Sequence, residues 1–134
     1  MGRTALIVLD THVLLWAIAD SKRLSRTADA AIRRSRQGDG LAISAITLWE
    51  LASLVARGRI RGYGTIESSL NRLIEGITVK PITPEIATLA TQFPDDYPHD
   101  PADRLIGATA RAEGLALITR DESIRKSPLL KTIW

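Results

Sequence analysis

The chain has 134 residues, a length that predicts a single domain over residues 1–134 burying roughly two-thirds of its unfolded surface. It contains no cysteine and only two histidines, which excludes disulfides and thiolate sites for zinc or iron–sulfur clusters, so oxygen atoms would have to hold a bound metal. The formal net charge of +3 is compatible with a nucleic-acid partner but is weak evidence by itself.

The apolar runs are too short to cross a membrane, since a transmembrane helix needs roughly 20 apolar residues. The first run ends at Asp10 and lacks the small-residue cleavage site that follows the apolar part of a signal peptide. The sequence therefore predicts a cytoplasmic protein with no membrane span.

The first half of the chain alternates apolar runs with helical patterns. Residues 4–9 form a largely apolar run typical of a buried parallel strand, and the apolar pattern over 11–19 predicts a helix that is buried or covered by a partner. The next elements are a helix over 25–36 with a basic side, a short strand over 41–43, and a helix that starts at Ser44 or Thr47 and ends near Ala56.

The second half continues this alternation after an arginine- and glycine-rich loop over residues 57–64. Prolines mark two helix starts, at Pro84 and at Pro101, where Asp100 fits an N-cap. The expected elements are helices over 65–75, 83–93, 100–112 and after Asp121, with strands over 77–81, 115–119 and 129–134. This order predicts an α/β fold with a mainly parallel sheet, right-handed crossovers and helices on both faces.

Acidic residues lie at four junctions where an apolar run ends and a helical pattern begins: Asp10, Glu50, Asp103 and Asp121. Taken singly, each is best explained as a helix cap or as a charge that complements the helix dipole, and residues 47–50 and 119–122 match the capping-box pattern. Taken together, the four would project to one edge of the sheet if their strands are neighbours. Carboxylates held that close raise one another's pKa and persist only where a cation compensates them.

This set of acids predicts a metal site formed by Asp10, Glu50, Asp103 and Asp121. Oxygen ligands select hard ions, so Mg²⁺ is the expected occupant and Mn²⁺ is the alternative, with one or two ions in the site. Such an ion suits hydrolysis of phosphodiesters, because it lowers the pKa of a water molecule and neutralises charge on the phosphate. The four acids are therefore the candidate catalytic residues.

Polar and basic residues beside the acids are candidates for binding substrate. Thr11 and Thr119 could hold a water molecule or a phosphate, and could equally cap backbone amides. Arg104 and Arg120, together with the arginines of residues 57–61, could bind RNA phosphates, against the alternative of a solvated basic face. The three tryptophans are expected in the core or at an interface, and not as platforms for bases.

Four segments of the chain carry a family resemblance. They are Leu-Asp-Thr-His-Val-Leu-Leu-Trp at residues 9–16, Ser-Ala-Ile-Thr-Leu-Trp-Glu-Leu at 44–51, His-Asp-Pro-Ala-Asp-Arg-Leu-Ile at 99–106 and Ile-Thr-Arg-Asp at 118–121. In this order they closely resemble the motifs of the VapC toxins, which are PIN-domain ribonucleases of type II toxin–antitoxin modules. The resemblance extends from the first strand to Trp134.

The resemblance implies a three-layer α/β/α sandwich, Mg²⁺-dependent endoribonuclease activity on structured RNA such as tRNA or rRNA, and inhibition by a cognate antitoxin. It implies that the four acids named above bind the metal, with Thr119 as the polar residue commonly found before the last of them. It favours Asp103 over Asp100, because the Arg-Leu-Ile-x-Ala pattern follows Asp103. The helix over 11–19 and its neighbours would form a homodimer face or a groove for the antitoxin. The chain departs from the family at Ala102, where close relatives often carry a bulky apolar residue.

Two other functions are compatible with parts of this pattern. An Asp at the end of a first strand accepts phosphate in phosphatases of the haloacid dehalogenase type, but these enzymes need a second Asp two residues later, where this chain has His12. The other alternative is a catalytically inactive module of the PIN-like fold that binds RNA or a protein partner without turnover. Metal-dependent stabilisation distinguishes such a module from a metal enzyme.

Overall fold

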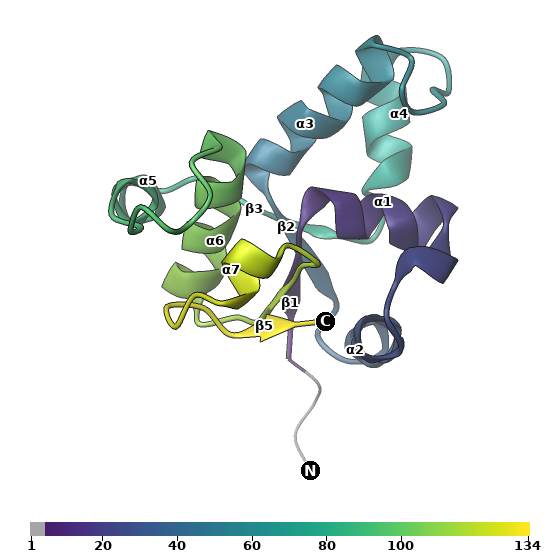
Figure 1. The fold of residues 1–134 in the computed structure, drawn as a ribbon. Helices are drawn as coiled ribbons and strands as arrows, with labels where there is room; N and C mark the ends of the chain where they lie inside the picture. Colours follow the sequence, from purple (N-terminus) through teal and green to yellow (C-terminus); the bar gives the residue numbers. More distant parts are fainter. Residues whose placement is uncertain (1–4) are drawn as a thin grey trace.

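The strands of the described chain, residues 5–134 of a computed structural model, form one sheet in which every neighbouring pair is parallel (Figure 1). This confirms the predicted α/β fold with its parallel sheet. The predicted first strand starts at Thr4, which lies outside the described residues. The strand order is β3-β2-β1-β4-β5, with bounds Thr78–Lys80, Leu41–Ser44, Ile7–Leu9, Leu117–Ile118 and Thr132–Ile133.

Two hydrophobic cores lie on opposite faces of this sheet. Ile7 and Leu9 of β1 belong to one core and Val8 to the other, so the central strand is buried on both faces, as an uninterrupted apolar run predicts. The chain is thus a three-layer α/β/α sandwich. Among the described residues, no helix has the length and the apolar composition of a membrane span. Helices α1 to α4 cover the first core and α5 to α7 the second, with bounds Thr11–Ala19, Arg26–Gln37, Ala45–Ala56, Ile66–Leu73, Pro84–Thr91, Pro101–Glu113 and Glu122–Arg125.

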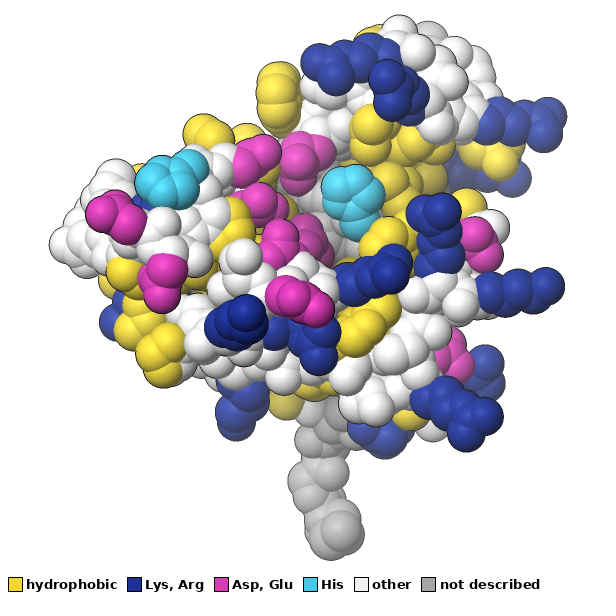
Figure 2. All heavy atoms as spheres, in the orientation of Figure 1, with side chains coloured by type: hydrophobic (Ala, Val, Ile, Leu, Met, Phe, Trp, Pro, Cys, Tyr) yellow, Lys and Arg dark blue, Asp and Glu magenta, His cyan; other side chains and the backbone are white. Residues whose placement is uncertain are grey.

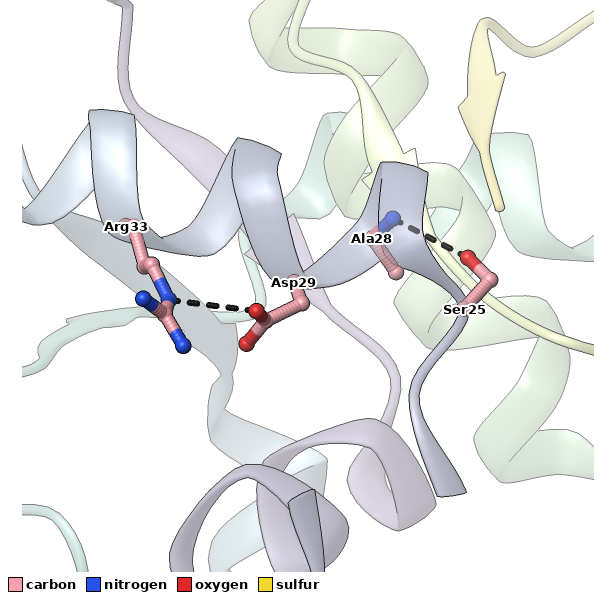
Figure 3. Close-up of polar contacts among 4 residues, drawn as sticks. All are labelled: Ser25, Ala28, Asp29 and Arg33. Atoms are coloured by element: carbon pink, nitrogen blue, oxygen red, sulfur yellow. Dashed lines mark hydrogen bonds and ion pairs between the residues drawn. The ribbon is translucent and has the colours of Figure 1, made fainter. Parts of the chain in front are cut away.

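Helix α2 shows how the local sequence sets a helix end and its solvent face (Figure 3). Ser25 is the N-cap, since its Oγ accepts a hydrogen bond from the backbone N–H of Ala28 at 3.0 Å. Arg33 Nε lies 3.1 Å from Asp29 Oδ2, in an ion pair one turn apart on the outer side of the helix. The opposite side is buried, so the basic side faces solvent as predicted. A short 3₁₀ helix, η1 (Ser21–Arg23), precedes α2 and was missed in the sequence.

Helix α3 starts earlier than the capping-box pattern predicts. Its N-cap is Ser44, whose Oγ accepts a hydrogen bond from the backbone N–H of Ile46 at 3.3 Å. This confirms Ser44 as the start, and the capping box over 47–50 is wrong. Because the helix begins at Ala45, Glu50 lies in the second turn, beyond the free N–H groups of the helix start.

Three predicted strands extend beyond the residues that pair. The runs over 115–119 and 129–134 contain Leu115, Leu129 and Leu130, which pack into the second core without belonging to β4 or β5. The run over 77–81 pairs only over Thr78–Lys80. Apolar residues that follow or precede a strand into the core have the same composition as the strand itself, so the sequence alone does not mark the end of pairing.

The strand order reverses between β1 and β4. The chain runs from β1 to β2 and β3 on one side of the sheet, and then continues to β4 and β5 on the other. In open parallel sheets such a reversal opens a crevice outside the carboxyl ends of the two strands. Asp10 directly follows β1 and Asp121 follows β4, so the topology places both acids at this crevice.

The segment between α5 and α6, residues 92–100, is fixed by side chains at the start of α6 and by its own aromatic residues. Tyr97 is buried, and its hydroxyl donates a hydrogen bond to the backbone oxygen of Asp103 at 3.1 Å. The rings of Phe93 and Tyr97 are stacked with centroids 4.0 Å apart. Arg104 donates hydrogen bonds to the backbone oxygens of Phe93, Pro94, Tyr97 and Pro98. These contacts hold the first turn of α6, which carries Asp103.

The tryptophans divide between the core and the surface. Trp16 and Trp134 are partly buried and pack against the first core, as predicted. Trp49 of α3 is 64% exposed, which excludes the core and leaves an interface as its predicted place. Helices α3 and α4 extend beyond the sheet and are joined by the exposed basic segment of residues 57–64 (Figure 1).

Gly107 of α6 packs directly against Tyr97. A Cβ atom at this position would overlap with the Tyr97 hydroxyl and would lie 3.2 Å from Cζ of Phe93. We expect Gly107→Ala to lower the free energy of unfolding by about 1–3 kcal/mol, measured by urea denaturation. Because the hydroxyl makes the tightest contact, the loss should be smaller in a Tyr97→Phe background. An equal loss in both backgrounds would show that the hydroxyl is not the obstacle.

Candidate active site

A pocket lined by acids opens at the crevice between β1 and β4. Its volume is about 220 Å³, and Figure 2 shows acidic side chains gathered in a hollow of this face. His12, Trp16 and Arg120 are part of its lining. The acids in the lining are Asp10, Glu50, Asp100, Asp103 and Asp121. The structure therefore brings together the four acids singled out in the sequence, with Asp100 as a fifth, and we refer to this site as the acid pocket.

Asp10 is held from two sides. One carboxylate oxygen accepts a hydrogen bond from the backbone N–H of Thr11 at 2.8 Å, and the other accepts one from the Thr119 hydroxyl at 2.8 Å. Thr119 is buried and also accepts a hydrogen bond from the backbone N–H of Asp121 at 3.1 Å. Burial raises the pKa of Asp10, and the hydrogen bond from Thr119 lowers it in part. One threonine thus links the ends of β1 and β4 to the start of α7.

The Glu50 side chain lines the pocket from α3, and two buried threonine hydroxyls lie beside its carboxylate. Thr11 Oγ1 donates a hydrogen bond to Glu50 Oε1 at 2.5 Å and lies 3.0 Å from Thr47 Oγ1. Because the single hydroxyl proton of Thr11 goes to Glu50, Thr47 is the donor in the second pair. Burial raises the pKa of Glu50, and the charges of Asp10 and Asp100 raise it further. The hydrogen bond from Thr11 lowers this pKa in part.

Asp103 carries the least compensated negative charge of the pocket. Its carboxylate makes no hydrogen bond or ion pair with residues 5–134. Burial, and after it the charges of Asp10, Asp100, Asp121 and Glu50, raise its pKa to about 7. A cation placed beside Asp103 would offset this repulsion and favour the charged carboxylate.

Besides Asp10, which caps α1, two acids of the pocket cap helices. One oxygen of Asp121 accepts hydrogen bonds from the backbone N–H groups of Ser123 at 2.8 Å and Ile124 at 3.2 Å. One oxygen of Asp100 accepts a hydrogen bond from the backbone N–H of Ala102 at 2.8 Å. The capping box predicted over 119–122 is wrong, because Asp121 itself is the N-cap of α7. Capping uses one oxygen of each carboxylate, and the second makes no hydrogen bond with the described chain.

The donor set of the acid pocket suits a hard divalent cation. Carboxylate oxygens are the ligands that Mg²⁺ and Mn²⁺ prefer, and the pKa values of Asp10, Glu50 and Asp103 are raised by burial and by neighbouring negative charge. In their present positions, no group of three or more His, Asp or Glu side chains among residues 5–134 is placed to hold a metal ion. A cation here would therefore take a few carboxylates and complete its coordination with water, as Mg²⁺ commonly does.

The two arginines predicted to contact substrate lie in different surroundings. The Arg104 guanidinium donates hydrogen bonds to backbone oxygens of residues 92–100. These contacts explain the orientation of Arg104 without a bound substrate. Arg120 is exposed, lines the acid pocket and makes no ion pair with the described residues. The arginines of residues 57–61 are exposed and do not line the pocket.

Two residues that support the site were missed in the sequence. Thr47 lies three residues before Glu50 on the same face of α3, and this spacing could have shown that the two side chains share surroundings. Tyr97 has no comparable local signal, because its contact with Asp103 arises only from the packing of the preceding segment against α6.

The sequence of the chain is similar to those of known proteins. The sequence pattern of the PIN domain matches residues 7–128. The chain is 40% identical over 130 residues to Ribonuclease VapC22 of Mycobacterium tuberculosis. The aligned region covers 96% of this chain and 98% of the relative.

Solved structures share the fold at low sequence identity. VapBC2 from Rickettsia felis, bound to a DNA fragment from its promoter, has a TM-score of 0.72 at 18% identity, covering 96% of this chain and 97% of the other. VapC20 of Mycobacterium tuberculosis, a sarcin–ricin loop cleaving toxin, has a TM-score of 0.62 at 18% identity, covering 90% and 93%. These likenesses confirm the α/β fold.

The raised pKa of Asp103 should make the metal-free protein less stable as the pH rises. The unfolded chain releases this proton near the ordinary value of 3.8, whereas the folded chain keeps it to about 7, so stability present at acid pH is lost between these values. Asp103→Asn should therefore raise the thermal midpoint relative to wild type above about pH 7, and much less near pH 4. Thermal melts in chelator over this range check the expectation. A difference that does not vary with pH would contradict the explanation by charge.

Proposed function

The chain belongs to the PIN-domain family, and we propose that it is the ribonuclease toxin of a type II toxin–antitoxin module, of the VapC type. Its proposed activity is Mg²⁺-dependent hydrolysis of phosphodiester bonds in structured RNA such as tRNA or rRNA. The observation that carries the proposal is the gathering of acids in one pocket where the strand order reverses. The similarity to Ribonuclease VapC22 supports the activity, and the similarity to the sarcin–ricin loop cleaving toxin supports structured RNA as the substrate class.

We assign metal binding and catalysis to Asp10, Glu50, Asp103 and Asp121, with Mg²⁺ as the ion and Mn²⁺ as a substitute. Such an ion supplies a water molecule of lowered pKa and neutralises charge on the scissile phosphate. The hydrogen bonds to Asp10 keep both its oxygens in place before a ligand arrives. A cation held in the acid pocket would favour the charged form of Asp103, because a neighbouring positive charge lowers the pKa of a carboxyl group.

The neighbouring residues receive supporting roles. Thr11 and Thr119 orient Glu50 and Asp10 through their hydroxyls. Arg104 holds the segment over 92–100. Arg120 is assigned to an RNA phosphate, because a pocket of carboxylates repels the backbone and an unpaired guanidinium at its edge offsets that repulsion.

A cognate antitoxin is the proposed inhibitor. A structural relative from Klebsiella pneumoniae is a toxin–antitoxin complex, which supports a partner of this kind. Ile18, Trp49 and Ile66 of α1, α3 and α4 are exposed and offer apolar surface to such a partner or to a second copy of the chain. A homodimer and a cytoplasmic location are part of the same proposal.

Cleavage of purified tRNA and rRNA tests the activity. We expect cleavage with Mg²⁺ or Mn²⁺ and none in chelator, because the acids alone supply no nucleophile. Asp10→Asn should lower the rate by roughly a hundredfold or more, since it removes a charged oxygen ligand. Asp96→Asn is the matched control, because Asp96 is exposed and lies outside the lining of the acid pocket.

Two results of that experiment would remove the proposal. Cleavage that persists in chelator, or that Asp10→Asn leaves intact, would mean that the acid pocket is not the catalytic site. Binding of RNA without cleavage by any metal-loaded sample would favour the inactive module instead.

Thr119→Val tests how Asp10 is controlled, since it removes the hydroxyl and keeps the size of the side chain. The hydrogen bond from Thr119 lowers the pKa of Asp10, so its loss should raise this pKa and move the acid limb of the activity profile to higher pH. Activity at neutral pH should fall roughly tenfold. Thr88→Val, at an exposed hydroxyl of α5, is the control. An unshifted pH profile in Thr119→Val would show that this bond does not set the protonation of Asp10.

A further inference from the structure

One wall of the acid pocket is aromatic and basic. His12 and Trp16 are four residues apart on α1 and share one helix face, with ring centroids 6.1 Å apart. Arg120 lines the pocket beside them, and the Trp134 ring follows with its centroid 6.0 Å from that of Trp16. Figure 2 shows basic and hydrophobic side chains along one border of the acidic hollow. We refer to His12, Trp16, Arg120 and Trp134 as the aromatic wall.

The aromatic wall leads into a second pocket beyond Trp134. This pocket has a volume of about 500 Å³ and is lined by Glu122, Arg125, Lys126, Thr132 and Trp134. Arg125 and Lys126 are exposed and make no ion pair with the described residues. The two pockets share no lining residue, but Trp16 of the acid pocket contacts Trp134 of the second pocket through their rings, so the acid pocket, the two tryptophans and this pair of cations follow one another.

Two guanidinium groups lie near the Trp16 ring, and neither is held there tightly. Arg120 Cζ lies 5.8 Å from the centroid of the Trp16 ring and has no carboxylate partner in the described chain. Arg23 Cζ lies 5.7 Å from the same ring and pairs with the exposed Asp20 at 3.6 Å. Both distances are near the outer limit of cation–π attraction, so these guanidinium groups are held only weakly at the ring.

We propose that RNA next to the scissile phosphate runs from the acid pocket over Trp16 and Trp134 to Arg125 and Lys126, with one base packed on the Trp16 indole. This inference rests on the proposed function, because it assigns the path of the RNA at that site. Unpaired RNA is recognised by bases stacked on aromatic rings and by cations along the backbone, and the aromatic wall offers these groups in that order. Trp16 thereby acts as a platform for a base, contrary to the role expected from the sequence.

Binding measurements test this path separately from cleavage. The probes are a labelled short oligouridylate and a ribose-phosphate oligomer of the same length without bases, with Ca²⁺ in place of Mg²⁺ to occupy oxygen ligands. The wild-type protein should bind the oligouridylate roughly tenfold more tightly in fluorescence anisotropy. Trp16→Leu should abolish this preference, while Trp16→Phe should keep most of it because a ring remains. Trp49→Leu, at a tryptophan outside the acid pocket, is the matched control and should keep the preference for the probe with bases.

The salt dependence of RNA binding measures the contribution of Arg125 and Lys126 at the end of the path. Joint substitution of Arg125→Gln and Lys126→Gln should reduce the slope of log Kd against log salt concentration by roughly 1 to 2, because fewer counterions are released. The matched pair Arg57→Gln and Arg59→Gln, on the exposed loop between α3 and α4, should leave the slope unchanged.

Several outcomes would overturn the path. No preference for bases in the wild type, or a preference that survives in Trp16→Leu, would mean that bases pack elsewhere. If the salt slope fell with Arg57→Gln and Arg59→Gln and not with the substitutions at Arg125 and Lys126, the RNA backbone would lie on the other side of the acid pocket. Unchanged RNA binding by Trp16→Leu with weaker binding of the antitoxin would make the wall a protein interface. A failure to hydrolyse RNA with Mg²⁺ would remove the proposed function and leave these binding results standing.

Discussion

The hydrogen bond from Thr119 to Asp10 joins the two strands at which the sheet reverses its order. It connects residues 109 positions apart in the chain, and the same threonine accepts a hydrogen bond from the backbone of Asp121. Asp10 is mostly buried and lies among other carboxylates, so without this donor its charged form would be still less favourable. The bond therefore fixes the first acid of the pocket and the start of α7, and the remaining acids are arranged around it.

Helix starts make this concentration of negative charge tolerable. Helices α1, α6 and α7 begin at Asp10, Asp100 and Asp121, so three positive helix ends meet at the acid pocket. Each cap uses a carboxylate that also lines the pocket, so capping and the proposed metal binding fall on the same set of acids. Asp103 lies in the first turn of α6 but accepts no capping hydrogen bond, and its raised pKa indicates that the helix ends do not compensate the whole charge. What remains uncompensated is the part of the site that a hard cation fits.

The sequence predicted the parts of the structure that local patterns determine. Asp10 and Asp121 follow apolar runs, and the rule that parallel strands open a crevice at their carboxyl ends was enough to bring them together. The start of α3 was ambiguous because Ser44 and Thr47 are both good N-caps, and only the fold shows that Thr47 is buried beside Thr11. The contacts of Arg104 and Tyr97 depend on how residues 92–100 pack on α6, and no spacing in the sequence encodes that packing.

A crystal grown with Mn²⁺ and measured at the manganese absorption edge tests most directly whether the acid pocket holds a hard divalent cation. The expected result is an anomalous peak inside the pocket, roughly 2.1 Å from carboxylate oxygens of Asp10 and Asp103, with water molecules completing the coordination. A peak found only outside the pocket, or none at saturating Mn²⁺, would contradict the metal-dependent nuclease derived from these acids.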